Sequence, residues 1–195
     1  MAPALRRIPR LLAISPPVEA SSWVDRAPEL VAAGADGLLL RVFDDAPIEG
    51  WVERLLATGA TVVLHAACGA YRGVGLHLPD GAPIPEHRGL VGISAHDAAG
   101  LQVDADYALL APVFAPRSKP TSRPPLGLDG LRALIAGARM PVLALGGITP
   151  GNAAACVAAG AHGVAGIGSF ADPASVAAIA AQLPVDGLAV PEEAP

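Results

Sequence analysis

Two glycine-containing segments have the residue types needed to hold a phosphate group. In PVLALGGITPGN (residues 141–152) Gly146 and Gly147 follow a short apolar run, and in GVAGIGSF (residues 163–170) Ile167 and Gly168 follow another. Glycine lets main-chain N–H groups approach an anion without a Cβ in the way, and the start of a following helix adds partial positive charge. We interpret the segments as two halves of one phosphate cup. The alternative is that the glycines only form tight turns.

Cationic or protonatable side chains stand at the ends of other apolar runs, or in the loops beyond them: Arg41, His65, His77, His96 and Lys119. If these runs are strands of a parallel barrel, their C-terminal ends meet at one mouth, where such barrels carry their chemistry. Five such groups at one mouth would favour an anionic substrate. Because histidine titrates near neutral pH, His65 and His96 are candidates for acid–base catalysis.

Each of these residues also has a structural explanation. Arg41 could pair with the aspartates that follow it, and His65 or His96 could cap a loop. A histidine within a strand, such as His77, is more often a hydrogen-bonded core residue than a catalyst. Lys119 is the only lysine among 13 basic residues, which favours a site that needs a compact hydrated charge, although a chance surface lysine would look the same.

The apolar runs themselves predict the fold. They are continuous rather than alternating, as expected for a parallel sheet with both faces covered. Between most of them lie helical patterns, so the chain reads as repeated βαβ units. The eight expected strands cover residues 11–15, 37–42, 61–65, 73–78, 91–94, 107–113, 142–145 and 164–167. The expected helices cover residues 18–33, 48–57, 97–103, 128–138, 150–159 and 173–183.

This alternation predicts an α/β fold, a single-domain (β/α)8 TIM barrel over residues 1–184, with a flexible C-terminal tail over residues 185–195. One crossover, at residues 66–73, is too short for a full helix. An open doubly wound sheet is the structural alternative. Thr149 before Pro150 and Asp172 before Pro173 are expected helix N-caps, and glycines at 34 and 160 are expected to end helices.

Composition excludes several classes of protein. With 195 residues, 52% of them hydrophobic, the chain can bury one sizeable core. The net charge of −5 argues against a nucleic-acid partner, and no apolar run is long enough to cross a bilayer. The first apolar run ends at Ser15, too soon for a secretory signal, so we expect a cytoplasmic protein. Cys68 and Cys156 are too few for a disulfide framework, and no HExxH motif or carboxylate cluster predicts a metal site.

A longer pattern connects these fragments. GISAHDAAGLQVDADYALLAPVFAPRSKP (residues 92–120), followed by GLDGLRALIAGARMPVLALGGITPGNAAACVAAGAHGVAGIGSF (residues 127–170), resembles the thiamine phosphate synthase and TenI (thiazole tautomerase) family. The resemblance is good from about residue 73 to 183 and weaker before it. It implies a (β/α)8 barrel.

The resemblance also implies roles for individual residues. The synthase branch joins an aminopyrimidine pyrophosphate to a thiazole phosphate: pyrophosphate leaves, and the thiazole nitrogen captures the resulting carbocation. Mg²⁺, an arginine and lysines neutralise the departing charge. The matching positions are Gly147, Ile167 and Gly168 for the thiazole-phosphate cup, Arg41 for the family's arginine, and Ser94 and Lys119 for the serine and lysine that face the pyrophosphate.

The departures from the family pattern concern the metal first. The asparagine–aspartate pair after the third strand is His65 and Ala66 here, and the aspartate of the family's HLGQED segment falls at Ala82, with Asp80 close by. Since Mg²⁺ binds through hard oxygen ligands, we expect it only if synthase activity is retained. Phe43 replaces a lysine, and Ser118 is the one hydroxyl left from a TPT motif.

The TenI branch needs no metal, because it moves a proton to make an aromatic thiazole carboxylate phosphate. Its histidine before VF is Pro112 here, so His65, His96 or His77 would have to carry the proton. The favoured hypothesis is TenI-like proton transfer on a phosphorylated thiazole; the alternatives are a thiamine phosphate synthase and a non-catalytic binder of thiazole or thiamine phosphate. We expect no nucleic-acid or membrane partner, and self-association into a homo-oligomer is left open. A valine at Gly147 is expected to fill the cup with little effect on folding.

Overall fold

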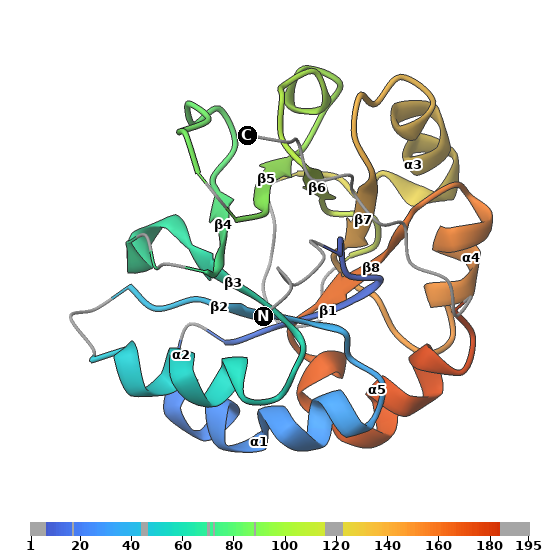
Figure 1. Ribbon diagram of the computed structural model, residues 1–195. Coiled ribbons are helices and arrows are strands. Elements are labelled where there is room, and N and C mark those ends of the chain that lie inside the picture. Colours follow the sequence, from blue (N-terminus) through green and yellow to red (C-terminus); the bar gives the residue numbers. More distant parts are fainter. Residues whose placement is uncertain are drawn as a thin grey trace.

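The computed structural model describes residues 7–16, 18–43, 47–69, 71, 73–87, 89–115 and 123–183. Eight parallel strands pair in sequence order and close into a barrel (Figure 1), so the prediction of a (β/α)8 barrel is confirmed. The expected tail at residues 185–195 lies outside the described residues. The strands are β1 (Leu11–Ile14), β2 (Gly37–Leu40), β3 (Thr61–His65), β4 (Gly75–Leu78), β5 (Val91–Ala95), β6 (Tyr107–Leu110), β7 (Val142–Leu145) and β8 (Gly163–Gly166).

The continuous apolar strands are explained by burial on both faces. One set of strand residues fills the inside of the barrel, including Leu12, Leu39, Val63, Leu109 and Leu143. Their neighbours along each strand belong to the larger cluster that packs against the surrounding helices. Because side chains alternate between the two faces of a strand, both sets must be apolar, and no polar alternation remains in the sequence.

Five α-helices cover one side of the barrel (Figure 1): α1 (Ala20–Ala32), α2 (Glu49–Leu56), α3 (Gly127–Ile135), α4 (Ala153–Ala158) and α5 (Pro173–Ala180). On the β4–β6 side, the described residues of three crossovers contain no α-helix. The abbreviated crossover predicted after β3 is confirmed, with only the 3-10 turn η1 (Ala66–Cys68). The crossover after β4 has no helix in its described part.

The helix expected at residues 97–103 is wrong: only the 3-10 turn η2 (Ala99–Leu101) forms there. The Asp97 carboxylate accepts hydrogen bonds from the N–H groups of Ala99 and Gly100, at 3.0 and 3.2 Å. Aspartate that bonds its own following backbone in this way favours a turn over a helix.

The helix boundaries follow the predicted caps in part. Gly34 and Gly160, with φ of 113° and 105°, end α1 and α4 as expected. Asp172 caps α5, accepting from the N–H groups of Ala174 and Ser175. The Thr149 cap is wrong, because residues 149–152 form a turn and α4 begins only at Ala153.

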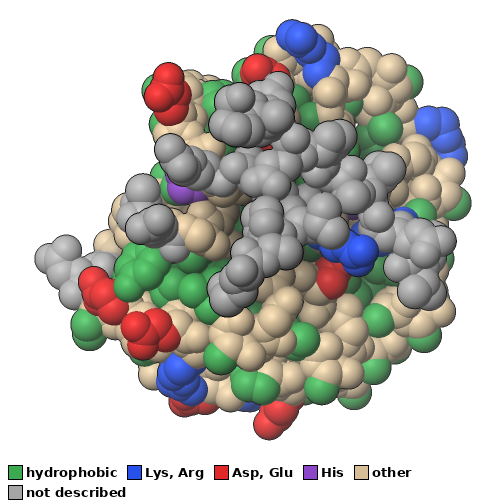
Figure 2. All heavy atoms as spheres, viewed as in Figure 1, with side chains coloured by type: hydrophobic (Ala, Val, Ile, Leu, Met, Phe, Trp, Pro, Cys, Tyr) green, Lys and Arg blue, Asp and Glu red, His purple; other side chains and the backbone are tan. Residues whose placement is uncertain are grey.

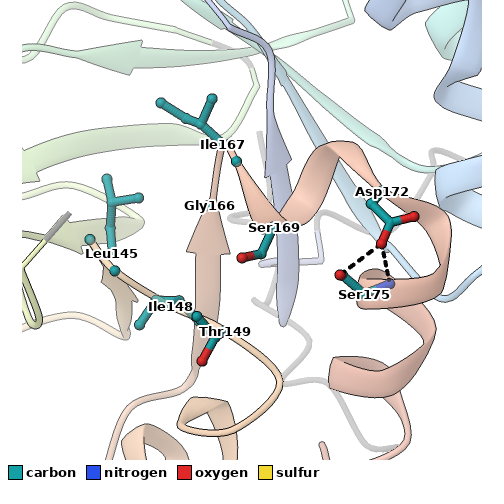
Figure 3. Close-up of a pocket in the computed structure, with 11 residues that line it drawn as sticks. Leu145, Ile148, Thr149, Gly166, Ile167, Ser169, Asp172 and Ser175 are labelled. Carbon is teal, nitrogen blue, oxygen red and sulfur yellow. Dashed lines mark hydrogen bonds between the residues drawn. The ribbon is translucent and has the colours of Figure 1, made fainter. Parts of the chain in front are cut away.

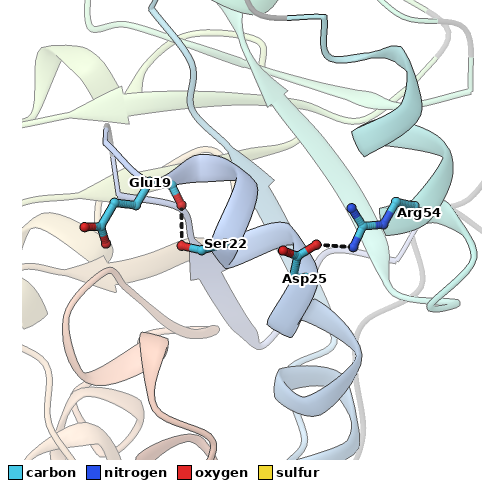
Figure 4. Close-up of polar contacts among 4 residues, drawn as sticks. All are labelled: Glu19, Ser22, Asp25 and Arg54. Atoms are coloured by element: carbon cyan, nitrogen blue, oxygen red, sulfur yellow. Dashed lines mark hydrogen bonds and ion pairs between the residues drawn. The ribbon is translucent and has the colours of Figure 1, made fainter.

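Contacts between the outer helices are mainly apolar. Trp23 of α1 and Val52 of α2 are buried. Arg54 of α2 forms an ion pair with Asp25 of α1, and the Ser22 hydroxyl donates to the Glu19 carbonyl (Figure 4). Since both charged side chains are more than half exposed, the ion pair contributes no more than about 1 kcal/mol. Buried apolar packing therefore holds α1 and α2 in place.

The surface shows no large patch of one charge on the face in Figure 2, where acidic and basic side chains are scattered among the residues that are not drawn in grey. Among the described residues, no helix is long and apolar enough to span a membrane. Cys68 and Cys156 are free thiols, and Cys156 is a buried residue of α4.

Candidate functional site

A pocket of about 410 Å³ opens where β7 and β8 end (Figure 3). It brings together the two glycine segments that the sequence analysis treated as halves of one cup. The lining residues are Leu145, Gly146, Gly147, Ile148, Thr149, Gly166, Ile167, Gly168, Ser169, Asp172 and Ser175. The C-terminal ends of barrel strands are where barrel enzymes bind their ligands.

The β7 side of the pocket is a turn held by side-chain hydrogen bonds. Gly146 and Gly147 have φ of 96° and 63°, a backbone region that favours glycine. The Asn152 side chain donates to the Gly147 carbonyl at 3.0 Å and accepts from the Thr149 N–H at 2.8 Å. Asn152 was only part of the sequence motif; in the structure it holds the turn together.

A side chain at Gly147 would not enter the pocket. Its Cβ would lie 2.7 Å from Phe114 Cβ and 2.8 Å from the Ala115 carbonyl oxygen. It would therefore push against the loop after β6, in a backbone conformation that already disfavours valine. The expectation that a valine at Gly147 leaves folding largely intact is wrong.

On the β8 side of the pocket, by contrast, a glycine has room for a side chain. Gly168 has an ordinary φ of −62° and precedes the 3-10 turn η3 (Ser169–Ala171). A Cβ at Gly168 would meet nothing within 4 Å. Within the described part of the chain, the N–H groups of Gly147, Gly168 and Ser169 donate to no protein acceptor. These donors are therefore available to an anion in the pocket.

Asp172 occupies the start of α5, which the predicted cup would have used to bind the anion. Its carboxylate lines the pocket and accepts from the N–H and the hydroxyl of Ser175 (Figure 3). It also accepts from the N–H of Ala174. These hydrogen bonds lower the pKa of Asp172. The start of α5 is thus capped by the protein's own carboxylate. The free donors of the pocket come from the β7 turn and the start of η3 instead.

The mouth of the barrel holds a second, polar group of residues. His65 and His77 are register partners at the ends of β3 and β4, with ring centroids 6.5 Å apart. Phe43, 56% exposed, lies between two of the predicted residues: its ring is 5.1 Å from His65 and 5.4 Å from the Arg41 guanidinium carbon. Arg41 and His65, far apart in the sequence, are therefore brought together.

Ser15 is a site residue that the sequence analysis missed. Its buried hydroxyl accepts from the Arg41 N–H at 2.8 Å and donates to the Arg41 carbonyl at 3.3 Å. Both hydrogen bonds fix the backbone from which the arginine leaves β2. The only available signal was a serine directly after the first apolar run.

Hydrogen bonds determine which nitrogen of two histidines carries the proton. His65 Nδ1 accepts from the Ala67 N–H at 3.2 Å, so the neutral ring has its hydrogen on Nε2. His96 Nδ1 lies 2.7 Å from the Ala111 carbonyl oxygen and must donate to it, which leaves Nε2 as an acceptor. Burial, then the Arg41 charge, lowers the pKa of His65. His65 is therefore a donor in its neutral form, whereas His96 Nε2 can accept and has no partner among the described residues.

His77 is a buried core residue, as expected. It is 3% exposed, and its Nε2 lies 3.0 Å from the Ser94 hydroxyl. Burial, with smaller contributions from His65 and Arg41, lowers the pKa of His77 from 6.5 to about 3. The folded protein thus holds His77 neutral near pH 7.

This burial predicts a loss of stability in mild acid. Because the folded pKa of His77 lies below the unfolded value of 6.5, the unfolded chain binds the proton first. The free energy of unfolding should fall by about 1 kcal/mol per pH unit as pH drops below 6.5. Urea unfolding at pH 7, 6 and 5 measures this slope. His77→Gln, which lacks the titrating group, should show a shallower slope; equal slopes for both proteins would contradict the prediction.

The residues present do not fit the Mg²⁺ that the synthase branch implies. The resemblance places Ala66 and Ala82 at the positions of the family's carboxylates. The exposed Asp80 directs Oδ1 toward Gly100, 3.2 Å from where a Cβ would be. No group of three His, Cys, Asp or Glu side chains among the described residues could hold a metal ion. Ser118 and Lys119 lie outside the described residues.

Comparisons with known proteins agree with the closed parallel barrel. Residues 76–170 match the family model described as thiamine monophosphate synthase. The thiamine-phosphate synthase of Myxococcus xanthus is 33% identical over 184 residues, covering 82% of this chain and 83% of that protein. The chain belongs to the thiamine monophosphate synthase family.

Other relatives match over shorter stretches. The thiamine-phosphate synthase of Moorella thermoacetica is 41% identical over 120 residues, which are 56% of this chain and 57% of that protein. The chain spans about half the length of several curated relatives that it matches. The structure of thiamine phosphate pyrophosphorylase from Pyrococcus furiosus is 20% identical with a TM-score of 0.71, covering 87% of this chain and 93% of that one, and supports the fold.

Proposed function

We propose that this protein binds a phosphorylated thiazole and catalyses proton transfer on it. The observation that carries the proposal is the pocket with three main-chain N–H groups that have no acceptor among the described residues, beside apolar side chains such as Leu145 and Ile167. A phosphate would accept from the N–H groups of Gly147, Gly168 and Ser169. The thiazole ring would then extend toward the barrel mouth.

The polar mouth supports proton transfer in particular. His96 has a free Nε2 that can accept a proton, and His65 has an Nε2–H that can donate one. A tautomerisation needs one group of each kind, to remove a proton from one atom and return one to another. The missing carboxylates at positions 66 and 82 favour this chemistry over a reaction that depends on Mg²⁺.

Thiamine phosphate synthesis is the second candidate, because the curated relatives carry that name. Arg41 and Ser94, which match the family's arginine and serine, lie at the mouth, where they would contact a pyrophosphate. A third candidate, a binder without activity, would use the pocket alone.

Three measurements on the full chain separate these functions: turnover of the thiazole tautomer, turnover of the two synthase substrates with Mg²⁺, and calorimetric binding of thiazole phosphate. We expect the thiazole carboxylate phosphate tautomer to be converted at an undiminished rate in the presence of EDTA. His96→Asn should slow this conversion at least about 100-fold, since it removes the base. The control is His87→Asn, because His87 bonds the Val74 carbonyl just before β4, away from the mouth.

Other outcomes identify the alternatives. Product only from aminopyrimidine pyrophosphate, thiazole phosphate and Mg²⁺ would assign the synthase reaction. Calorimetric binding of thiazole phosphate without turnover in either assay would assign the binder. Absence of binding would overturn all three.

A further inference from the structure

A short chain of hydrogen bonds runs from the inside of the barrel to its mouth. The Tyr107 hydroxyl lies 3.4 Å from His77 Nδ1, and His77 Nε2 lies 3.0 Å from the Ser94 hydroxyl. The Tyr107 and His77 rings stack, with centroids 5.9 Å apart. These three residues come from β6, β4 and β5, so only barrel closure brings them together.

The barrel makes room for this arrangement at one glycine. Gly92 is the register partner of Tyr107 on β5. A Cβ at Gly92 would lie 2.1 Å from Tyr107 Cζ and 2.4 Å from its hydroxyl oxygen. The ring therefore occupies the space that a side chain on β5 would need, and its position inside the barrel is narrowly defined.

The direction of each hydrogen bond follows from burial. Tyr107 is fully buried, and among the described residues His77 Nδ1 is the one partner of its hydroxyl. A buried O–H without an acceptor is costly, so the hydroxyl must donate to Nδ1. Nδ1 then carries no hydrogen. A neutral imidazole has one N–H, so Nε2 carries it and donates to Ser94.

The Ser94 hydroxyl ends this chain of hydrogen bonds at the mouth. Its oxygen accepts from His77, so its own hydrogen is free to point elsewhere. Ser94 is only half-buried, at the mouth end of β5. We propose that Tyr107 and His77 are positioning residues that make the Ser94 hydroxyl a hydrogen-bond donor toward an anionic oxygen at the mouth. The ligand side of this inference rests on the proposed function; the proton arrangement does not.

The proton arrangement is tested by NMR on the protein without ligand. In ¹⁵N-labelled wild type, His77 should show a protonated Nε2 and a bare Nδ1 at pH 7. Tyr107→Phe removes the donor to Nδ1, so a measurable fraction of His77 should shift its hydrogen to Nδ1. A protonated Nδ1 in the wild type would overturn the inference, whatever the protein's function. Because that measurement needs no substitution, it stands even if a variant fails to fold.

The ligand side is tested with inorganic pyrophosphate as the probe, by calorimetry. We expect Ser94→Ala to weaken binding about tenfold and Tyr107→Phe about threefold. In the double variant, Tyr107→Phe should add nothing to the loss from Ser94→Ala, because it acts through that hydroxyl. The control is Tyr71→Phe, the other tyrosine of the chain, which should bind as wild type does.

The outcomes are distinguishable. Unchanged affinity in Tyr107→Phe, or additive losses in the double variant, would overturn the positioning role. If the wild-type protein has the predicted His77 tautomer but does not bind pyrophosphate, the Ser94 hydroxyl does not donate to an anion of this kind. Failure of the proposed function alone would appear as absent turnover of the thiazole substrate with both predictions intact.

Discussion

Gly168→Val is expected to weaken binding of thiazole phosphate by at least about 100-fold, with the fold intact. Gly168 lines the pocket, has an ordinary φ of −62°, and has nothing within 4 Å of the position its Cβ would take. A branched side chain there meets no protein atom but occupies space next to the free N–H groups. Calorimetry with thiazole phosphate measures the loss, and circular dichroism checks the fold.

The matched control is Gly50→Val in α2, where a Cβ also meets nothing within 4 Å. It should leave affinity unchanged. If Gly168→Val binds thiazole phosphate as tightly as wild type does, the phosphate does not occupy this pocket. Gly147→Val cannot test the pocket in this way, because its side chain would strain the loop after β6. A loss of affinity in that variant could come from a disturbed fold and not from a blocked pocket.

Gly92→Ala is expected to lower the free energy of unfolding by about 3 kcal/mol. At a position with compatible backbone, alanine would normally stabilise a protein slightly by restricting the unfolded chain. Here the added methyl group would lie 2.1 Å from Tyr107 Cζ, inside a closed barrel where that ring is fully buried. Urea unfolding measures the difference.

Two further variants test the cause. Gly50→Ala, at an exposed position of α2, should be neutral or stabilising by up to about 1 kcal/mol. Tyr107→Leu removes the ring, so Gly92→Ala should cost clearly less in that background than in wild type. Equal costs in the two backgrounds would show that the methyl group collides with something other than Tyr107.

The pocket after β7 and β8 and the polar mouth of the barrel differ in how far the sequence could predict them. The pocket depends on main-chain groups at the ends of β7 and β8, and glycine marks such positions in the sequence itself. Gly146, Gly147, Ile167 and Gly168 all line one pocket in the structure. The direction of the Gly147 Cβ was not predictable, because it depends on Phe114 and Ala115 in a separate loop.

The mouth depends on side chains, and their states were not predictable. His65, His77 and His96 look alike in the sequence, as histidines at or near strand ends. Their partners differ: the Ala67 N–H for His65, the Tyr107 and Ser94 hydroxyls for the buried His77, and the Ala111 carbonyl for His96. Only His77, set within an apolar strand, carried a signal of burial.

The sequence by itself determined the eight strands, the parallel barrel and the family, because apolar runs, glycines and caps act locally and repeat along the chain. Tertiary structure decided which N–H groups stay unpaired, which nitrogen of each histidine carries the proton, and that Ser15 fixes the backbone of Arg41. These properties depend on distances between residues of different strands. Barrel closure sets those distances, and no local pattern of residues encodes them.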